Sequence, residues 1–332
     1  MSENKLHIVK LEKDRWKEWD TFVLAQRDGT IFHTTYWLSE QRSMQPGVYG
    51  LFQGDKLVGG VPLCVKEKWG IRITPQPFIT PYCGPVLSDV FIQNGLVTEA
   101  VKLILNDVYS RFDACRFSLP PQAHQLREAL IKLPFHKAGS RSITNLRTNR
   151  KARVAPDDLI DSYTRMSRRN DIRRSMRKGV YAQESTDWET IFRLSEESFR
   201  ISGREHPLKR DQFLGMAGKL HELGLCTGVI AFSPEKVPIA AAWTLSDRHT
   251  CYNVLAGVDQ DYRKLNGGSV ALHEAIRIAM ERKLIFDFGG SMMERVNTYL
   301  QSYGPEECWF THCRSVESAR FRLLEKTGLV RF

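Results

Sequence analysis

The sequence predicts a mixed α/β fold (α+β) built from two similar units, and three observations support this prediction. At 332 residues the chain exceeds the usual size of a single hydrophobic core, and 42% of its residues are hydrophobic, which is enough for well-packed cores. Stretches with strand and helix patterns alternate along its whole length. Two stretches of the first half also recur, in the same order, in the second half.

The recurring stretches are a hairpin and a turn–helix–strand unit. Residues 52–61 (FQGDKLVGGV) are echoed by residues 232–241 (FSPEKVPIAA), with a phenylalanine, an acid, a lysine and an apolar residue in register. Asn94-Gly95, a helix and Phe117 are echoed by Asn266-Gly267, a helix and Phe288. We therefore predict a duplicated unit, with domains at residues 1–150 and 151–332.

The first half is expected to begin with a strand, a helix and an aromatic-rich helical segment, at residues 6–11, 14–26 and 30–41. A hairpin of strands 48–52 and 57–65 follows, turned at Gly54-Asp55-Lys56. Residues 74–86, which include Tyr82, hold too many prolines for a helix or a central strand and predict an extended loop. The remaining elements are expected to be a helix at 94–110, a strand at 114–119, a helix at 122–133 and an extended segment at 135–146.

A strongly basic helix is predicted between the two halves, at residues 165–179. Ile172 and Met176 give it a narrow apolar stripe, and Gly179 ends it. Six cations lie within eleven residues and only Asp171 offsets them: Arg168, Arg169, Arg173, Arg174, Arg177 and Lys178. The helix is either a solvated surface or a phosphate-binding one, and mutual repulsion of the cations favours phosphate contact. We therefore expect substrate contacts from Arg169, Arg173 and Lys178.

The second half is organised around residues 263–291. Helices at 188–202 and 211–223 and strands at 226–232, 239–245 and 250–256 lead to it, and Arg204 and His206 in the loop at 203–207 are further candidates for substrate contact. In this stretch a basic, glycine-bearing loop is followed by a helix and then by the strand 285–288. Loop N–H groups and a helix N-terminus favour an anion, although Asn266-Gly267-Gly268 could equally be a simple turn and helix cap. A segment at 296–303, a strand at 308–313 and a helix at 316–327 complete the chain.

Composition excludes several classes of protein. The seven cysteines are scattered and form no C-x-x-C pair, so we expect reduced, mostly buried thiols, no disulfide framework and no metal site. The first 13 residues lack the apolar run of a signal peptide, and no 18-residue apolar stretch occurs, so we expect a cytoplasmic protein without a transmembrane segment. The net charge of +10 favours anionic partners: phosphorylated cofactors, tRNA or lipid headgroups at a membrane surface.

Several short motifs resemble those of a known family. They are FHTTYW at 32–37, GPV at 84–86, RKGV at 177–180, DYR at 261–263 and FDFGGS at 286–291. In this order they resemble the FemAB-like branch of the GNAT acyltransferase superfamily, including the BioF2-like acetyltransferases, from about Trp16 to Phe310. The resemblance implies two tandem GNAT-like domains, each a mixed, mostly antiparallel sheet flanked by helices. It also implies transfer of an acyl or aminoacyl group, from a thioester or an aminoacyl-tRNA, to an amine.

The resemblance also suggests where the donor binds. In GNAT enzymes the CoA pyrophosphate lies on a loop of pattern [R/Q]-x-x-G-x-[G/A], which corresponds here to Arg263-x-x-Asn266-x-Gly268. Asparagine tolerates positive φ, so the loop shape is compatible with CoA. The implied acyl-CoA site comprises Tyr262, Arg263, Lys264, Asn266, Gly267, Gly268 and Ser269.

Two departures from the family bear on the donor. Peptide-bridge-forming members resemble F-K-K-x-W-G near the end of the second domain, whereas residues 299–304 read YLQSYG and lack both lysines. The long helical arm of the larger tRNA-using members has no counterpart either. These differences favour an acyl thioester donor and leave aminoacyl-tRNA as the alternative. The implied acceptor is an amine on an amino sugar, nucleotide sugar or cell-envelope precursor, which allows peripheral membrane contact.

Transfer to an amine requires a base that removes a proton. Asp287, at a strand end before Gly289-Gly290, is the first candidate for base or acceptor binding, and the alternative is a carboxylate that bonds neighbouring N–H groups. Tyr303 and Glu274 are weaker catalytic candidates, and Ser291 and Tyr82 complete the expected substrate contacts. A function of another class, a non-catalytic module that binds RNA or an anionic ligand through the basic helix, predicts salt-sensitive affinity that needs no acyl donor.

Overall fold

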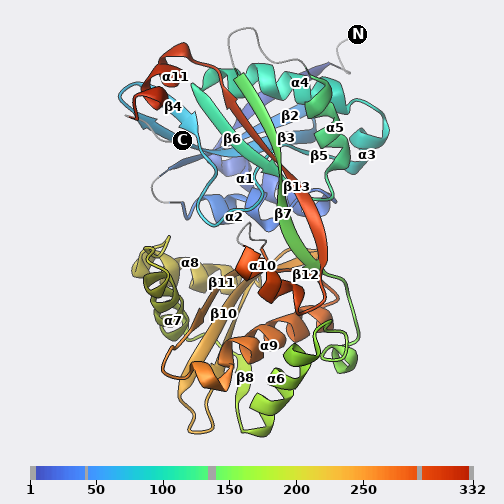
Figure 1. The fold of residues 1–332 in the computed structure, drawn as a ribbon. Helices are drawn as coiled ribbons and strands as arrows, with labels where there is room; N and C mark the ends of the chain where they lie inside the picture. Colours follow the sequence, from blue (N-terminus) through green and yellow to red (C-terminus); the bar gives the residue numbers. More distant parts are fainter. Residues whose placement is uncertain (1–4, 42–43, 134–139, 290–293, 329–332) are drawn as a thin grey trace. The chain divides into compact units, whose positions relative to one another are not determined.

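The computed structural model describes residues 5–41, 44–133, 140–289 and 294–328. The chain divides into two compact units: unit 1 is Met1–Leu146 with Trp309–Phe332, and unit 2 is Arg147–Cys308. The two boundaries fall within strands β7 (Ser140–Lys151) and β13 (Glu306–Val316). Unit 2 is therefore an insertion into the sequence of unit 1 (Figure 1).

Unit 1 contains a mixed, mostly antiparallel sheet. Its strand order is β1 (Leu6–Leu11), β2 (Gln45–Gln53), β3 (Lys56–Lys68), β4 (Ile71–Thr74), β6 (Ala114–Leu119) and β13, and the short β5 (Val86–Leu87) pairs with β3. The β4–β6 pair is parallel, and the β1–β2, β2–β3, β3–β4, β3–β5 and β6–β13 pairs are antiparallel. Side chains of β2 and β3 alternate between the two faces of the sheet, and apolar side chains on each face pack against helices.

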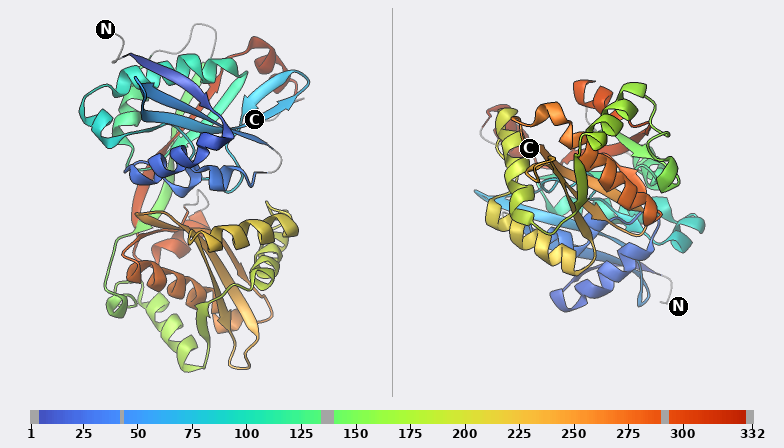
Figure 2. Two further views of the ribbon diagram at one scale, coloured as in Figure 1. Left: turned by 180° about the vertical axis from the view of Figure 1, so that it is seen from behind. Right: turned by 90° about the horizontal axis from the view of Figure 1, so that it is seen from below.

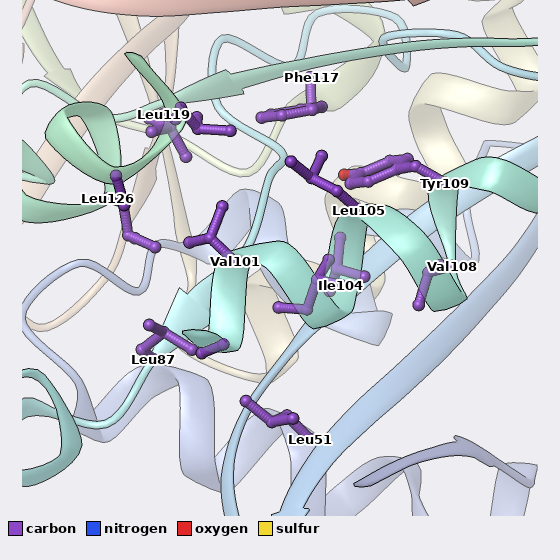
Figure 3. Close-up of a cluster of buried hydrophobic side chains, with 14 of the residues drawn as sticks. Leu51, Leu87, Val101, Ile104, Leu105, Val108, Tyr109, Phe117, Leu119 and Leu126 are labelled. Atoms are coloured by element: carbon purple, nitrogen blue, oxygen red, sulfur yellow. The ribbon is translucent and has the colours of Figure 1, made fainter. Parts of the chain in front are cut away.

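The helices of unit 1 cover these two faces. On one face are α1 (Trp16–Ala25) and α2 (Thr35–Leu38); on the other are α4 (Val97–Asp107) and α5 (His124–Lys132) (Figures 1 and 2). Val101, Ile104 and Leu105 of α4 pack against Leu51, Phe117 and Leu119 of the sheet and Leu126 of α5 (Figure 3). The remaining helices of this unit are α3 (Asp89–Gln93) and α11 (Ala319–Lys326).

Unit 2 repeats the plan with its own sheet and helices. The strand order is β7, β12 (Ile285–Asp287), β11 (Thr250–Val258), β10 (Pro238–Ser246), β9 (Cys226–Phe232) and β8 (Tyr181–Glu184). The pairs are antiparallel except β11–β12. Helices α6 (Met166–Arg177) and α9 (Gly267–Glu281) lie on one side and α7 (Trp188–Ile201) and α8 (Arg210–Glu222) on the other, with α10 (Glu294–Gln301) following β12 (Figure 1).

In the sheet of unit 2, strand β11 is longer than its neighbour β12. Strand β12 pairs with β11 only at Thr250, Cys251 and Tyr252. Strand β11 then continues to Val258, beyond the end of β12 at Asp287. Among the described residues, no strand pairs with this side of β11 after Tyr252, and Val258 at its end lies beside Gly268 at the start of α9. Short single turns of 3-10 helix occur at Lys13–Arg15, Ile31–His33, Tyr109–Arg111, Pro156–Asp158 and Arg263–Leu265.

The predicted mixed α/β fold, with mostly antiparallel sheets flanked by helices, is confirmed. Strands β4 and β8 and helix α3 were not predicted. The sequence also placed residues 309–332 with the second domain, whereas the structure places them in unit 1, because β13 pairs with β6 from Thr311 to Val316. Among the described helices, none combines the length and hydropathy needed to span a bilayer.

Candidate active site

An open pocket of about 690 Å³ lies in unit 2, where the start of α9 meets the ends of α7 and β11. Five predicted site residues line it together, Arg204, Arg263, Asn266, Gly268 and Ser269. The other lining residues are Ile201, Ser202, Val258, Gln260, Val296 and Tyr299. The structure thus brings the loop predicted to bind an anion and a predicted substrate contact to one place.

The loop before α9 has the geometry of an anion cradle. The turn Arg263–Leu265 ends at Asn266, whose φ of 53° and ψ of 32° are left-handed, as expected for asparagine in this position. Helix α9 begins at the next residue, and Ser269 N donates to Asn266 O at 2.9 Å. The amides of Gly267 and Gly268 precede the first intrahelical bonds, so they are available to a ligand at the positive end of the helix dipole.

Two glycines allow the start of α9 to approach the sheet closely. A Cβ at Gly267 would lie 2.8 Å from Ile239 Cδ1 of β10. A Cβ at Gly268 would lie 2.6 Å from Val258 Cγ2 of β11. A side chain at either position would force the facing Ile239 or Val258 side chain, or the start of the helix itself, to shift, so both glycines favour this close approach.

One tyrosine lines the pocket on the α10 side, and a second, buried tyrosine lies behind it. Tyr299 is 38% exposed and lines the pocket, and its hydroxyl lies 2.9 Å from that of the buried Tyr303. The Arg168 guanidinium covers both rings, at 4.5 and 4.9 Å, and donates to Ser269 Oγ and, at 2.9 Å, to Ser302 Oγ. Burial raises the pKa of Tyr303 well above its usual value, so its hydroxyl keeps its proton.

Asp287, the first catalytic candidate, is buried at the end of β12 and already has partners. Its Oδ1 accepts from Thr148 Oγ1 at 2.6 Å and from Gly289 N at 2.9 Å, and its Oδ2 accepts from Arg150 Nε at 2.9 Å. The Arg150 pairing follows from the β7–β12 register, which places the two residues opposite each other. This geometry favours the structural alternative, a carboxylate that holds neighbouring donors.

The other catalytic candidate, Glu274, lies on α9 but not among the residues that line the pocket. Its carboxylate accepts from Arg277 Nε and Nη2 at 2.8 and 2.7 Å. Glu274 and Arg277 lie one turn apart from each other on the helix, which is the usual arrangement of a stabilising ion pair. The geometry gives Glu274 a role in helix stability.

The predicted substrate contacts are distributed over several places. Arg169 Nη1 donates to the carbonyls of Asp161 and Tyr163, and Arg173 pairs with the Asp161 carboxylate at 2.6 Å, so both hold a local loop. Lys178 is exposed at the end of α6.

His206 lines a second pocket of about 590 Å³, which shares Arg204 with the first. Tyr82 is buried in unit 1 against Phe32 and Phe310, Tyr262 packs against the unit 2 core, and Lys264 is exposed. Ser291 lies outside the described residues.

A group of buried ionisable residues behind the tyrosines was not predicted. Lys151 Nζ donates to the carbonyls of Ser162 and Gly304, both at 3.4 Å, and burial lowers the pKa of this lysine to about 8. Tyr163 OH lies 2.8 Å from His273 Nδ1, and burial lowers the pKa of His273 to about 4. These side chains come from β7, α9 and a loop, so no local pattern could have found them. Within the described ranges, no cluster of three or more His, Cys, Asp or Glu residues could hold a metal ion.

Comparisons with known proteins agree with this geometry. Residues 166–297 match the family described as acetyltransferase (GNAT) domain. The chain is similar in structure to FemX, with 13% identity, a TM-score of 0.71 and coverage of 96% of this chain and 99% of that one. A conserved protein of unknown function from Bacteroides thetaiotaomicron has 11% identity and a TM-score of 0.61, with 94% and 100% covered.

L-PGS from Bacillus licheniformis has 10% identity and a TM-score of 0.55, with coverage of 96% of this chain and 97% of that one. No curated protein sequence is significantly similar to the chain. The family match lies wholly within unit 2 and contains the loop and the glycines of the pocket, and Tyr299 follows it by two residues. Residues 166–297 of unit 2 are therefore similar to an acetyltransferase (GNAT) domain, and the chain as a whole shares the fold of FemX.

Proposed function

We propose that the protein is an N-acyltransferase that takes an acyl group from acyl-CoA and transfers it to an amine. The observation that carries this proposal is the pocket at the start of α9, where the first turn of the helix, at Gly268, meets two arginine side chains. The amides of Gly267 and Gly268, with Arg263 and Arg204, suit a pyrophosphate. Acyl-CoA would supply a thioester that an amine can attack.

The chain's own residues would then manage the protons. Tyr299 presents its hydroxyl to the pocket, and the Tyr303 hydroxyl fixes its orientation by a 2.9 Å hydrogen bond. Because the Tyr303 hydroxyl stays protonated, this pair is suited to donate a proton to a departing thiolate. Tyr303 would thus act through Tyr299, and Asp287 would position the end of β12 through Thr148 and Arg150.

The proposed acceptor is an amine of an amino sugar or a cell-envelope precursor. The resemblance of the motifs supports it, and so does the likeness of the fold to FemX and L-PGS. The second pocket, which adjoins the first at Arg204, offers space for a polar acceptor beside the donor.

The test is a binding and product screen on the full chain. Thermal-shift measurements with CoA, acetyl-CoA, longer acyl-CoAs and UDP-amino sugars should reveal the donor, and mass spectrometry should identify any acylated product. Arg263→Ala is expected to weaken CoA binding, whereas Arg248→Ala, which removes an exposed arginine outside the pocket, is the matched control. A folded protein that no thioester stabilises would refute the donor assignment.

A second candidate donor, an aminoacyl-tRNA, is favoured by the outer face of α6. Arg174, Arg177 and Lys178 are exposed there and point away from the buried Ile172. If tRNA is the donor, Arg177→Glu should abolish tRNA binding and leave CoA binding unchanged, and tRNA affinity should fall steeply with salt. Equal tRNA affinities of the wild type and Arg177→Glu would count against it.

A further inference from the structure

We propose that unit 1 carries a docking surface for an anionic phospholipid membrane. It is formed by the tip of the β3–β4 hairpin, residues 66–72, and by helix α11, and we call it the hairpin–α11 surface. The proposal concerns unit 1 alone and does not depend on the identity of the donor or the acceptor.

The hairpin tip presents a tryptophan to solvent. Trp69 lies in the tight turn with a φ of 54°, and its large apolar side chain is 63% exposed. Lys68 Nζ lies 4.3 Å over that ring. An exposed tryptophan beside a cation matches the side chains that proteins place at the interface between lipid headgroups and acyl chains.

Helix α11 extends the same surface. Arg320 Nη2 donates to Trp69 O at 3.0 Å, which holds the helix beside the hairpin tip, and both views of the ribbon show α11 next to β4 (Figures 1 and 2). Phe321 is buried and Leu324 packs inward with it. Leu323, one turn after Arg320 on the helix, is 64% exposed. The outer face of α11 thus adds an aliphatic side chain to the exposed tryptophan.

Charge complementarity selects the occupant. Six cations lie on these two segments: Lys66, Lys68, Arg72, Arg320, Arg322 and Lys326. Two acids lie on the same segments and each pairs with an arginine, Glu67 with Arg72 and Glu325 with Arg314, so six cations and two acids leave an excess of four positive charges. An exposed Trp and Leu ringed by Lys and Arg is the pattern of an interfacial membrane contact. A single-stranded nucleic acid would instead need successive aromatic faces for base stacking.

The experiment is co-sedimentation of the full chain with vesicles. We expect binding to an equimolar mixture of phosphatidylglycerol and phosphatidylcholine, much weaker binding to phosphatidylcholine alone, and a decrease with salt. Lys68→Glu should weaken partitioning about 30-fold, since each unit of charge near such a surface changes affinity by about fivefold. Trp69→Ala and Leu323→Ser should each weaken it about tenfold, as expected when roughly half of a large apolar side chain leaves the lipid.

Matched controls come from elsewhere on unit 1. Ile131→Ala removes a 56% exposed apolar side chain from α5, and Lys102→Glu reverses an exposed charge on α4, so neither should change partitioning. Brominated lipids should quench the fluorescence of the wild type more than that of Trp69→Phe, which tests the depth of this ring directly.

The proposal is overturned if Trp69→Ala and Ile131→Ala bind vesicles equally, or if the full chain does not bind anionic vesicles at all. It is also overturned if Trp69→Ala weakens binding to single-stranded RNA but not to vesicles, because that result would assign the surface to nucleic acid. Unchanged melting temperatures of the variants would confirm that each effect reports on the surface rather than on folding.

Discussion

A structural role of Asp287 is distinguished from a catalytic one by removing its carboxylate first alone and then together with its partner Arg150. In Asp287→Ala, the Arg150 guanidinium loses its carboxylate partner, and its side chain is only 11% exposed. Thr148 Oγ1 and Gly289 N lose their acceptor at the same time. Breaking one half of a buried ion pair costs about 3–5 kcal/mol. This is a large part of the 5–15 kcal/mol that usually stabilises a domain, so loss of activity in this variant alone proves little.

The double variant Asp287→Leu/Arg150→Met resolves the ambiguity. Replacing both charges by apolar side chains of similar size should restore most of the free energy of unfolding measured in urea, to within about 1–2 kcal/mol of the wild type. If Asp287 only positions the end of β12, acyl transfer should recover with stability. If Asp287 is the general base, the folded double variant should remain about 10²–10⁴-fold slower, and our structural interpretation of Asp287 would be refuted.

Four further predictions follow from the pocket and the residues behind it. Gly268→Ala should raise the calorimetric Kd for CoA, because its Cβ would lie 2.6 Å from Val258 Cγ2, whereas Gly218→Ala in α8, where the Cβ meets nothing within 4 Å, should not. Asn266→Ala should lower the free energy of unfolding by about 1 kcal/mol because of its left-handed backbone, and Asn266→Gly should not. Burial holds the pKa of Lys151 at about 8, below its ordinary 10.5, so the unfolded state binds more protons between these pH values. Stability should therefore rise with pH across this window, and Lys151→Met should abolish the rise. Burial likewise lowers the pKa of His273 from 6.5 to about 4, so the unfolded state binds more protons than the folded state between these pH values. The stability of the protein should therefore be fully present above pH 6.5 and should fall as the pH decreases to 4. His273→Gln should flatten this part of the thermal-stability profile, and an unchanged slope would contradict the assignment.

The elements that the sequence predicted are those with a long periodic pattern. Strands β1, β6 and β9 and helices α6, α7 and α8 agree with prediction to within a residue or two at most ends. Strand β8 was missed because it is a four-residue edge strand with no buried side chain and hence no alternation. Residues 309–316 were assigned to the wrong part of the chain because their partner strand β6 lies almost 200 residues earlier, and only long-range pairing reveals it.

The same contrast holds for the site. Asn266, Gly268 and Ser269 are adjacent in sequence, so local reasoning could place them together. The donors that hold Asp287 come from β7, with separations of 139 residues for Thr148 and 137 for Arg150, so they could not be foreseen. Tyr299 could have been suspected, because it lies four residues before the candidate Tyr303, a spacing that brings side chains together in a helical stretch, although α10 itself ends at Gln301.

The recurring Asn-Gly pairs of the two halves adopt different local structures. In unit 2, Asn266 takes the positive φ and Gly267 opens the helix. In unit 1, Asn94 has a φ of −77°, Gly95 takes the positive value of 75°, and α4 begins only at Val97. Similar residues thus make different turns, and only the turn in unit 2 presents the amides of a helix N-terminus directly after a left-handed residue.

The insertion of unit 2 within unit 1 sets an order of assembly during synthesis. The sequence of unit 2 is contiguous, so this unit can fold as soon as residue 308 has left the ribosome. Unit 1 must wait for β13, since until residues 311–316 are made, β6 keeps an unpaired edge of backbone N–H and C=O groups. A stop codon that removes only the last two dozen residues should therefore leave unit 2 intact and make unit 1 prone to aggregation. Unit 1, whose synthesis begins before that of unit 2, is therefore the unit whose fold is completed last.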